Sequence, residues 1–495
     1  MEHTTIARDP EDQKLSQIDE DKVLEPQGFN LRALDNNAES DQDVSSRFIK
    51  CLRTWGVESR GIYPVPVEHR TDPQFSKSFF VWLSSNLNIL SFSEGTVGVL
   101  VYGLTFRQVA GVIVGFNLLS ALPPAYFSTF GPKLGLRQMV QARYSFGWFG
   151  VIVPGVFNLL SMMGYNILNA ILAGQTLSVV SGGKMSWSIS FFGYRILNWY
   201  ERVAWAPVLL VYLVVLGVGG KNLTSGDAPL APAKNVLSFG ATVAAFVISY
   251  SALMSDYTNY MRADVPSWKV FLSSYLGLLL PVTSAQLVGA AFATSFASNP
   301  SWQAGYEAAG VGGLVDVVLS PCGGFGKFLT VLLALSVIAN MSPTLYSFGI
   351  SAQVVLPFTA HMPRYVFSIA GTGILIPLAI VGSTRFEETL VDFLGLVGYW
   401  PSTFIAVVAV EHVAFRKYWA YDILDWNTPG RLAPGIAALG ACVVYWTDRK
   451  DDGGHWIRGW VVLDWDIVRS ATNVGETGVW TINKKRGLSD PLVFS

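Results

Sequence analysis

Polar side chains and a proline interrupt the apolar run 332–347, an arrangement that is typical of a small binding site inside a membrane. Pro343 has no backbone N–H and its ring presses on the carbonyl four residues earlier, so it opens the helical hydrogen-bond ladder. Opened backbone is tolerated at membrane depth where it lines a polar cavity. Because Asn340 and Thr344 flank the proline, we interpret this segment as one wall of a substrate site. The alternative is a proline kink whose polar side chains bond to neighbouring helices.

A single carboxylate lies near the centre of the first apolar segment of the chain. Glu94 is followed by glycines at 95 and 98, and three hydroxyl residues lie close to it. This composition predicts a helix that is locally unwound over 91–98, where half-helix ends can hold ions or polar ligands. A carboxylate inside the membrane can relay protons, so Glu94 is a possible proton relay. The alternative is that it faces a water-filled vestibule or bonds to a neighbouring helix.

A tyrosine and an asparagine four residues apart share one face of the expected helix 148–180. The ring of Tyr165 can stack on a flat ligand, and the amide of Asn169 offers both a donor and an acceptor. This pair therefore suits the edge of a heterocycle, and Tyr250 in a later segment could stack in the same way. The alternative is packing between helices.

Sequence motifs of enzymes and metal sites are missing. The stretches 217–221 and 323–327 resemble phosphate loops, but each lacks the Ser or Thr that follows the lysine. No HExxH motif or nucleophile elbow occurs, and the three cysteines are far apart. We therefore expect no enzyme activity, no catalytic residue, no metal site and no cofactor. A net charge of −1 gives no reason to expect nucleic-acid binding.

The composition is that of a polytopic protein whose surroundings are a lipid bilayer. Of the 495 residues 51% are hydrophobic and 14% are charged, whereas soluble domains contain about 25% charged residues. A spanning helix needs about 20 apolar residues. Segments near this length occur at 79–103, 108–130, 148–180, 203–219, 236–255, 270–297, 325–356, 365–382 and 389–411. Two shorter segments, 185–194 and 433–446, are marginal.

Basic residues gather in alternate connections between these segments. The richer connections contain Lys133, Arg137, Arg143, Arg195, Arg202, Arg262, Lys269, His361, Arg364, Arg416, Lys417 and Arg431. The opposite connections contain Arg107, Lys184, Lys221, Lys234, Lys327 and Arg385. By the positive-inside rule, this alternation predicts a multi-pass protein with a cytoplasmic N-terminus.

Three regions are expected along the chain. Residues 1–75 begin with an acidic stretch that has no apolar run, and they predict a disordered cytoplasmic tail. Residues 76–446 form the expected transmembrane domain, and 447–495 form an atypical C-terminal tail. The connections rich in basic residues all fall on the same side of the membrane only if 185–194 crosses it. Ten residues are too few, which favours a deletion in the protein or in its gene model.

Several short stretches of this chain resemble the fungal purine-cytosine permeases of the nucleobase–cation symporter family. The matching stretches are 82–87 (WLSSNL), 130–139 (FGPKLGLRQM), 143–147 (RYSFG), 191–194 (FFGY), 200–202 (YER), 255–258 (SDYT) and 333–340 (LALSVIAN). The resemblance extends from about residue 75 to about residue 440, and the combination of motifs is specific to the family.

The resemblance implies an all-α membrane protein with an inverted five-helix repeat. The family has twelve helices, of which about 10–11 are recognisable here. It implies proton-coupled import of cytosine, adenine, guanine or hypoxanthine across the plasma membrane, with cation coupling where the first and eighth helices meet. The substrate contacts that it implies are Ser85, Tyr165, Asn169, Tyr250, Asn340, Pro343 and Thr344.

Three of these positions depart from the family pattern. The family usually has Trp at the positions of Tyr165 and Tyr250, and often a second Asn in place of Thr344. Tyrosine stacks with less area, and threonine lacks the paired donor and acceptor of an amide. The cargo is therefore a nucleobase or a related heterocycle, such as a pyridoxine-like vitamin or a secondary metabolite. A degenerate paralogue that does not transport is a further alternative.

Overall fold

The computed structural model of the chain describes residues 61–181, 204–224, 229–360, 362, 364–383 and 386–447. In this part of the chain the regular secondary structure is helical, apart from one isolated bridge between Asp72 and Met261. The marginal segment 185–194 and the C-terminal tail beyond residue 447 lie outside the described residues.

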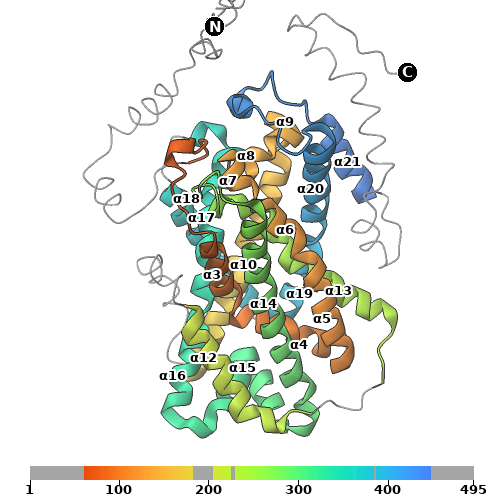
Figure 1. The fold of residues 1–495 in the computed structure, drawn as a ribbon. Helices are drawn as coiled ribbons and strands as arrows, with labels where there is room; N and C mark the ends of the chain where they lie inside the picture. Colours follow the sequence, from red (N-terminus) through yellow and green to blue (C-terminus); the bar gives the residue numbers. More distant parts are fainter. Residues whose placement is uncertain are drawn as a thin grey trace, which may run out of the picture. The chain divides into compact units, whose positions relative to one another are not determined.

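The helices follow the apolar segments closely (Figure 1). The first half of the described chain contains α3 (Ser76–Asn86), α4 (Ile89–Leu100), α5 (Phe106–Ser120), α6 (Leu122–Phe127), α7 (Phe130–Leu134), α8 (Gln138–Gln141), α9 (Arg143–Gly150), α10 (Ile152–Val180), α12 (Trp205–Gly219) and α13 (Ala233–Ile248). The second half contains α14 (Ser267–Thr294), α15 (Pro300–Leu319), α16 (Gly323–Leu335), α17 (Val337–Val355), α18 (Arg364–Gly382), α19 (Phe386–Val397), α20 (Tyr399–Val410) and α21 (Ile436–Thr447).

Short turns of 3-10 or π helix connect or extend these helices. They are η2 (Val67–His69), η4 (Gly220–Asn222), η5 (Ser249–Ala252), η6 (Met254–Tyr257), η7 (Phe296–Ser298), η8 (Ser320–Cys322), η9 (Pro357–Thr359), η11 (Glu411–Phe415) and η12 (Ile423–Asn427). Seven helical stretches of the described chain are long and apolar enough to cross a membrane. The predicted spans are thus occupied by helices, except for 185–194, which is not described.

The first span is divided between α3 and α4, but not where the sequence predicts. The segment 91–98 is helical, and the interruption lies upstream at Leu87 and Asn88. Asn88 has extended backbone angles, and its Oδ1 accepts a hydrogen bond from the N–H of Ser91 at 2.9 Å. An asparagine in this position caps the start of a helix and satisfies a free N–H. The helix therefore restarts at the cap, and the expectation of unwinding at the glycines is wrong.

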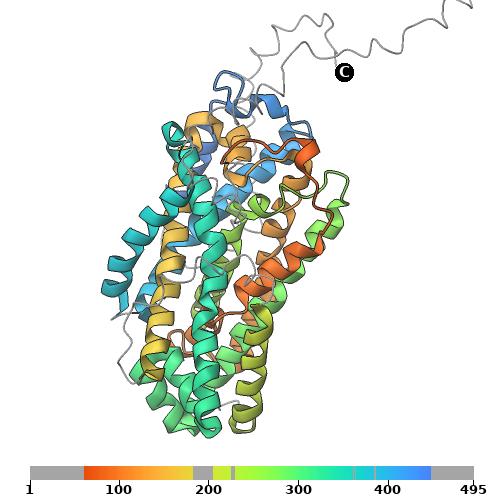
Figure 2. The same ribbon diagram turned by 90° about the vertical axis from the view of Figure 1, so that its left-hand side faces the viewer.

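The glycines of α4 allow close packing against α14. A Cβ at Gly95 would lie 1.9 Å from the carbonyl oxygen of Gln286, and a Cβ at Gly289 would lie 2.0 Å from that of Phe92. At these two glycines the backbones of α4 and α14 are in direct contact. On the other side of the domain, α10 and α17 pack along each other (Figure 1, Figure 2).

The predicted interruption at 340–344 is also displaced. Helix α17 continues through Pro343, and the break with α16 lies at Ser336. The hydroxyl oxygen of Thr344 lies 2.8 Å from the carbonyl oxygen of Met341 and 3.2 Å from that of Asn340. Neither is the carbonyl of Ala339, which is the one that loses its helical donor because Pro343 has no N–H. The helix continues through the proline with one ladder bond missing, so the expected interruption of the helix at 340–344 is wrong.

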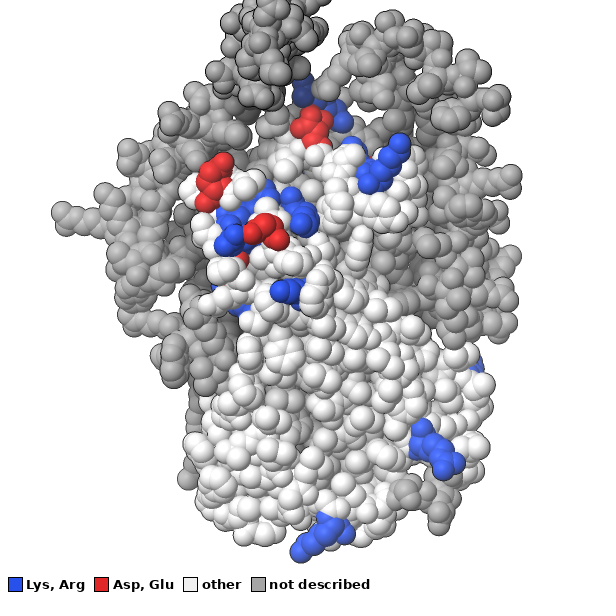
Figure 3. All heavy atoms as spheres, viewed as in Figure 1, with Lys and Arg blue, Asp and Glu red and all other residues white. Residues whose placement is uncertain are grey.

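Residues 61–75, which the sequence assigns to the N-terminal tail, pack on the end of the domain that contains α7, α8 and α9. The guanidinium of Arg70 donates to the carbonyls of Val65 at 2.8 Å, Pro132 at 3.0 Å and Leu134 at 3.1 Å. Figure 3 shows that charged side chains gather toward this end, while a broad zone below it is nearly free of charge. An uncharged zone of this kind is what a lipid bilayer requires.

Candidate functional site

The side chain of Asn340 connects four separate segments in the centre of the domain. Its Nδ2 donates to the carbonyl of Ser85 on α3 at 2.9 Å and to the Oη of Tyr250 on η5 at 3.0 Å. Its Oδ1 accepts a hydrogen bond from the Nδ2 of Asn169 on α10 at 2.8 Å. The structure therefore brings together four of the predicted site residues, all of them buried.

The two predicted stacking tyrosines lie on either side of this amide cluster. Tyr250 donates to the Oδ1 of Asn86 at 3.0 Å, and its ring meets that of Trp82 edge to face at 5.2 Å. The ring of Tyr165 meets that of Phe393 edge to face at 5.1 Å. Its hydroxyl accepts a hydrogen bond from the Oγ of Ser249 at 3.2 Å. Both rings are therefore held in position by neighbours from other helices.

Thr344 and Pro343 contribute to the same region from α17. The hydroxyl of Thr344 donates to the Oδ1 of Asn166 at 2.7 Å. The carbonyl of Pro343 accepts a hydrogen bond from the hydroxyl of Tyr257, which also lies 3.2 Å from the Oγ of Ser347. All seven predicted contact residues thus lie around one region, although Pro343 takes part through its backbone.

Asn166 is a site residue that the sequence reasoning did not single out. Its Nδ2 and the Oδ1 of Asn169 are both buried without a hydrogen-bond partner among the described residues. A buried polar atom without a partner costs about 1–3 kcal/mol, so this donor and this acceptor, three residues apart on α10, are candidates for contact with a ligand. The spacing of three residues from Asn169 on one helix was a signal that could have identified it.

The two helix interruptions adjoin each other beside the amide cluster. The N–H of Ile89, at the start of α4, donates to the Oγ of Ser336 between α16 and α17 at 3.1 Å. The carbonyl of Asn88 accepts from the hydroxyl of Tyr212 at 2.7 Å. Backbone groups at such breaks are the usual ligands for ions and polar substrates in transporters. The meeting of the first and eighth helices, expected from the family, is therefore present.

Glu94 is fully buried and contacts α14 from α4. Its Oε2 accepts a hydrogen bond from the Nε2 of Gln286 at 2.6 Å. The Oε1 of Gln286 in turn accepts from the Nδ2 of Asn117 on α5 at 2.6 Å. The second carboxylate oxygen, Oε1, has no hydrogen-bond partner in the described chain. The carboxylate therefore connects three helices through a short chain of amides.

The end of the domain at α7 to α9 is closed by buried polar contacts. Arg137 donates to the hydroxyl of Tyr346 at 2.7 Å and to the carbonyl of Asp256 at 2.9 Å. The Oδ1 of Asp256 accepts from the N–H of Gln138 at 2.9 Å. These contacts connect Asp256 on η6 to Arg137 and to Gln138 on α8. In the adjacent α9, burial lowers the pKa of Arg143 to about 10, so it stays charged at neutral pH.

The described residues contain no cluster of three or more His, Cys, Asp or Glu side chains that could hold a metal ion. The polar groups of the centre are instead amides, hydroxyls and backbone carbonyls. Such groups recognise a neutral ligand by its hydrogen-bond donors and acceptors.

The overall fold is that of a solved transporter. Mhp1, a nucleobase-cation-symport-1 family transporter solved in a closed conformation with bromovinylhydantoin bound, superposes with a TM-score of 0.64. The two chains are 14% identical, and the match covers 84% of this chain and 96% of Mhp1. A Na+-coupled sialic acid symporter matches with a TM-score of 0.51 at 13% identity, over 83% of this chain and 91% of that one. The predicted all-α transporter fold is confirmed.

Sequence comparison gives closer relatives. The purine-cytosine permease fcyB of Emericella nidulans is 33% identical over 77% of this chain and 78% of its own length. The purine-cytosine permease FCY2 of Saccharomyces cerevisiae is 32% identical over 82% of this chain and 83% of its own. The vitamin B6 transporter TPN1 of Saccharomyces cerevisiae is 29% identical over 75% of this chain and 68% of its own.

The family assignment covers most of the described domain. Residues 64–243 and 208–423 match a family described as a permease for cytosine/purines, uracil, thiamine and allantoin. This is a family of transporters and not of enzymes, as the missing catalytic motifs indicate. The chain belongs to this family of cytosine and purine permeases.

Proposed function

We propose that this protein is a secondary active transporter that imports a purine or pyrimidine nucleobase. The observation that supports the proposal best is the pair of unpartnered amide atoms, the Nδ2 of Asn166 and the Oδ1 of Asn169, beside Asn340. A nucleobase edge presents alternating donors and acceptors, and it can satisfy both atoms at once. Tyr165 and Tyr250 lie next to the amide cluster, and in this proposal their rings contact the ring of the cargo.

The proposed orientation places the α7–α9 end in the cytoplasm and the α15 end outside the plasma membrane. Its support is the excess of basic residues in the connections at the α7–α9 end, as the positive-inside rule requires. Two of the counted residues, Arg137 and Arg143, are buried in contacts within the protein, so the rule rests on the remaining ones.

We further propose that transport is coupled to protons and that Glu94 is the residue that carries the proton. A buried carboxylate can take up and release a proton, and its charge is costly to keep inside a membrane. The unpartnered Oε1 is a site for the proton, and Gln286 keeps the carboxylate in place through the Oε2. No organic cofactor is part of this proposal.

A related heterocycle is the second candidate for the cargo. The altered residues, Thr344 and the two tyrosines, lie in or beside the centre of the site. The similarity to a vitamin B6 transporter, TPN1, supports a pyridoxine-like ring. A change in a buried hydrogen-bond match can alter selectivity by orders of magnitude, so three substitutions are enough to change the cargo.

Uptake in a yeast that lacks nucleobase transport tests this proposal. Labelled cytosine, adenine, guanine, hypoxanthine and pyridoxine are offered at an acidic and at a neutral pH. The expected result is saturable uptake of at least one nucleobase, greater at the acidic pH. Uptake of pyridoxine alone would select the second candidate. A protein that reaches the membrane and takes up none of these compounds would be a relic that does not transport.

An asparagine variant tests the site itself. Asn169→Ala removes the open acceptor and the bond to Asn340, and it is expected to lower uptake at least about tenfold. Asn158→Ala is the matched control, because Asn158 also joins α10 to α17, through the Oγ of Ser351 at 3.0 Å, at another level of the helices. Equal uptake by both variants would contradict the site.

A further inference from the structure

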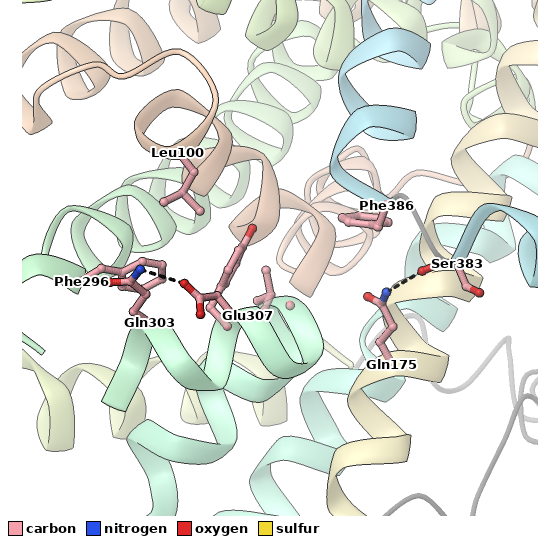
Figure 4. A pocket seen from close by; sticks show the side chains of 10 residues that line it. Leu100, Gln175, Phe296, Gln303, Glu307, Ser383 and Phe386 are labelled. Carbon is pink, nitrogen blue, oxygen red and sulfur yellow. Dashed lines mark hydrogen bonds between the residues drawn. The ribbon is translucent and has the colours of Figure 1, made fainter. Parts of the chain in front are cut away.

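A second cavity lies at the α15 end of the domain, away from the amide cluster. This α15 pocket has a volume of about 470 Å³, and among its lining residues are Gln175, Phe296, Gln303, Tyr306, Glu307 and Phe386 (Figure 4). Its size lies within the range of about 300–1,000 Å³ that is usual for small-molecule sites. The central amides do not line it, so it is separate from the site described above.

The helix that forms one wall of this pocket is broken at the pocket. Within α15, Ala309 and Gly310 leave the helical conformation, and Gly310 has a φ of 59°. The two halves fold against each other, since a Cβ at Gly313 would lie 2.0 Å from the carbonyl oxygen of Gly305. Gly310 itself lines the pocket. A helix that opens its backbone ladder at a cavity frees polar groups for a ligand.

Two amide side chains and a carboxylate supply polar contacts in the pocket. The Nε2 of Gln175 donates to the carbonyl of Ser383 at 3.2 Å, whereas its Oε1 is buried without a partner in the described chain. The Nε2 of Gln303 donates to the Oε1 of Glu307 at 2.8 Å and orients this carboxylate (Figure 4). Both groups offer acceptors, and acceptors of this kind suit the ring N–H and amino groups of a heterocycle.

Aromatic side chains supply the apolar part of the pocket. The rings of Phe296 and Tyr306 lie 5.4 Å apart, and Phe386 lies across from them next to Gln175 (Figure 4). Aromatic rings favour contact with a planar ligand over contact with a flexible one. The combination of aromatic walls and a few polar acceptors is the usual composition of a small-molecule site.

Two helices, α10 and α19, extend from this pocket to the central site. On α10, Gln175 is six residues after Asn169, a distance of about 9 Å along the axis at 1.5 Å per residue. On α19, Phe386 is seven residues before Phe393, the ring that contacts Tyr165, which corresponds to about 10.5 Å. The α15 pocket and the central site are thus bordered by the same two helices.

A contact between two hydroxyl groups connects the wall of the pocket to α4. The Oη of Tyr306, in the pocket wall, is 3.3 Å from the Oγ1 of Thr96 on α4. Thr96 also donates to the carbonyl of Ser93, one residue before Glu94. The pocket wall is therefore in contact with the helix that begins at the central break.

We propose that the α15 pocket is a second binding site for the planar heterocycle that this transporter carries, and that it holds the cargo before the cargo reaches the central amides. The inference rests on the proposed function, because the ligand class is that of the central site. The acceptors of Gln175 and Glu307 bind the N–H edge of the heterocycle, and the rings of Phe296, Tyr306 and Phe386 contact its faces.

Uptake kinetics and equilibrium binding of labelled hypoxanthine and cytosine test the proposal on the full-length protein. Glu307→Gln removes the charge of the carboxylate with little change in shape, and Gln175→Leu removes the unpartnered acceptor. Each variant is expected to raise KM by about tenfold and to leave the maximal rate unchanged, because the central site is intact. In purified protein, the wild type is expected to bind two molecules per chain, and the double variant one.

The control variant is Asp316→Asn, which removes a carboxylate from the same helix but outside the pocket. Unchanged KM and unchanged stoichiometry in both pocket variants, with Asn169→Ala still defective in uptake, would overturn the second site and leave the proposed function standing. Absence of uptake and of binding in the wild type, for every nucleobase, would instead overturn the proposed function and the second site with it. Glu307 is exposed, so the Glu307→Gln variant is expected to fold. It therefore tests the second site even if the Gln175→Leu variant does not fold.

Discussion

Asn169 on α10 and Asn340 on α17 join their side-chain amides directly, with the Nδ2 of Asn169 donating to the Oδ1 of Asn340 at 2.8 Å. They are separated by 171 positions in the sequence, and both are buried. An amide pair in the interior of a membrane protein holds two helices at a defined distance, and it leaves each amide with further donors or acceptors. The Oδ1 of Asn169 is the acceptor that stays open.

The first prediction concerns Asn340, which satisfies partners on three other segments. Asn340→Ala removes the bonds from Asn340 to the carbonyl of Ser85 and to the hydroxyl of Tyr250, and the bond that it accepts from Asn169, so the protein is expected to lose about 1–3 kcal/mol of stability. Uptake of the cargo is expected to fall to background. Thermal unfolding of the purified protein and uptake in cells measure the two effects. Asn158→Ala again provides the comparison, with a similar loss of stability but retained uptake; background uptake in this variant would show that packing alone explains the loss.

The second prediction concerns the hydroxyl of Thr344. Thr344→Val keeps the shape of the side chain but removes the donor to Asn166, so the Oδ1 of Asn166 becomes free to contact the cargo. We expect the preference between two competing nucleobases to change by about tenfold, because a single buried hydrogen-bond match is altered. Competition of unlabelled bases against labelled uptake gives the measurement. Thr344→Ser retains the donor and should behave as the wild type, and an unchanged preference in the valine variant would remove Thr344 from the site.

The third prediction concerns the dependence of uptake on pH. A proton that enters with the cargo is a second substrate, so wild-type uptake should increase as the external pH falls. Glu94→Gln keeps an acceptor for the Nε2 of Gln286 but cannot bind and release a proton at these pH values. Its uptake is expected to be reduced and to be the same at the two pH values.

The comparison with Asp316→Asn, whose uptake should keep the wild-type increase at acidic pH, separates this effect from a general loss of charge. A Glu94→Gln variant that retains both the rate and the pH dependence of the wild type would make Glu94 a structural link between α4 and α14, with no part in coupling.

The fourth prediction concerns the close contact of α4 and α14. Gly95→Ala places a methyl group 1.9 Å from the backbone carbonyl of Gln286, which cannot move aside as a side chain could. We expect a loss of about 1–3 kcal/mol or more and a lower yield of folded protein in detergent. Gly111→Ala on α5 meets nothing within 4 Å and should be stabilising by about 0.5–1 kcal/mol. If both variants melt at the same temperature, the backbone contact of the two helices is absent.

The sequence by itself determined the class of protein and the positions of most spans, and it predicted a set of binding residues. These features are local, because an apolar run of sufficient length can be read without knowing its neighbours. A polar side chain within such a run is costly and therefore informative. This is why Tyr165, Asn169, Tyr250 and Asn340 could be identified, and why the structure brings them into one region.

Only the tertiary structure decided where the helices break and which polar groups remain open. Pro343 predicts an interruption, but α17 continues through it. The boundary between α16 and α17 lies at Ser336, whose Oγ accepts a hydrogen bond from the N–H of Ile89, far away in the sequence. The open donor of Asn166 also depends on the tertiary structure, because the position of Thr344 shows that the Oδ1 of Asn166 has a partner and its Nδ2 has none.

The α15 pocket illustrates the same limit. Its helix is rich in glycine and has no uninterrupted apolar run, so the sequence predicts no element there. Its two halves are stabilised by packing, since a Cβ at Gly312 would lie 2.6 Å from Thr176 on α10. A segment with low intrinsic preference takes its conformation from the surface on which it packs, and that surface exists only once the other helices have assembled.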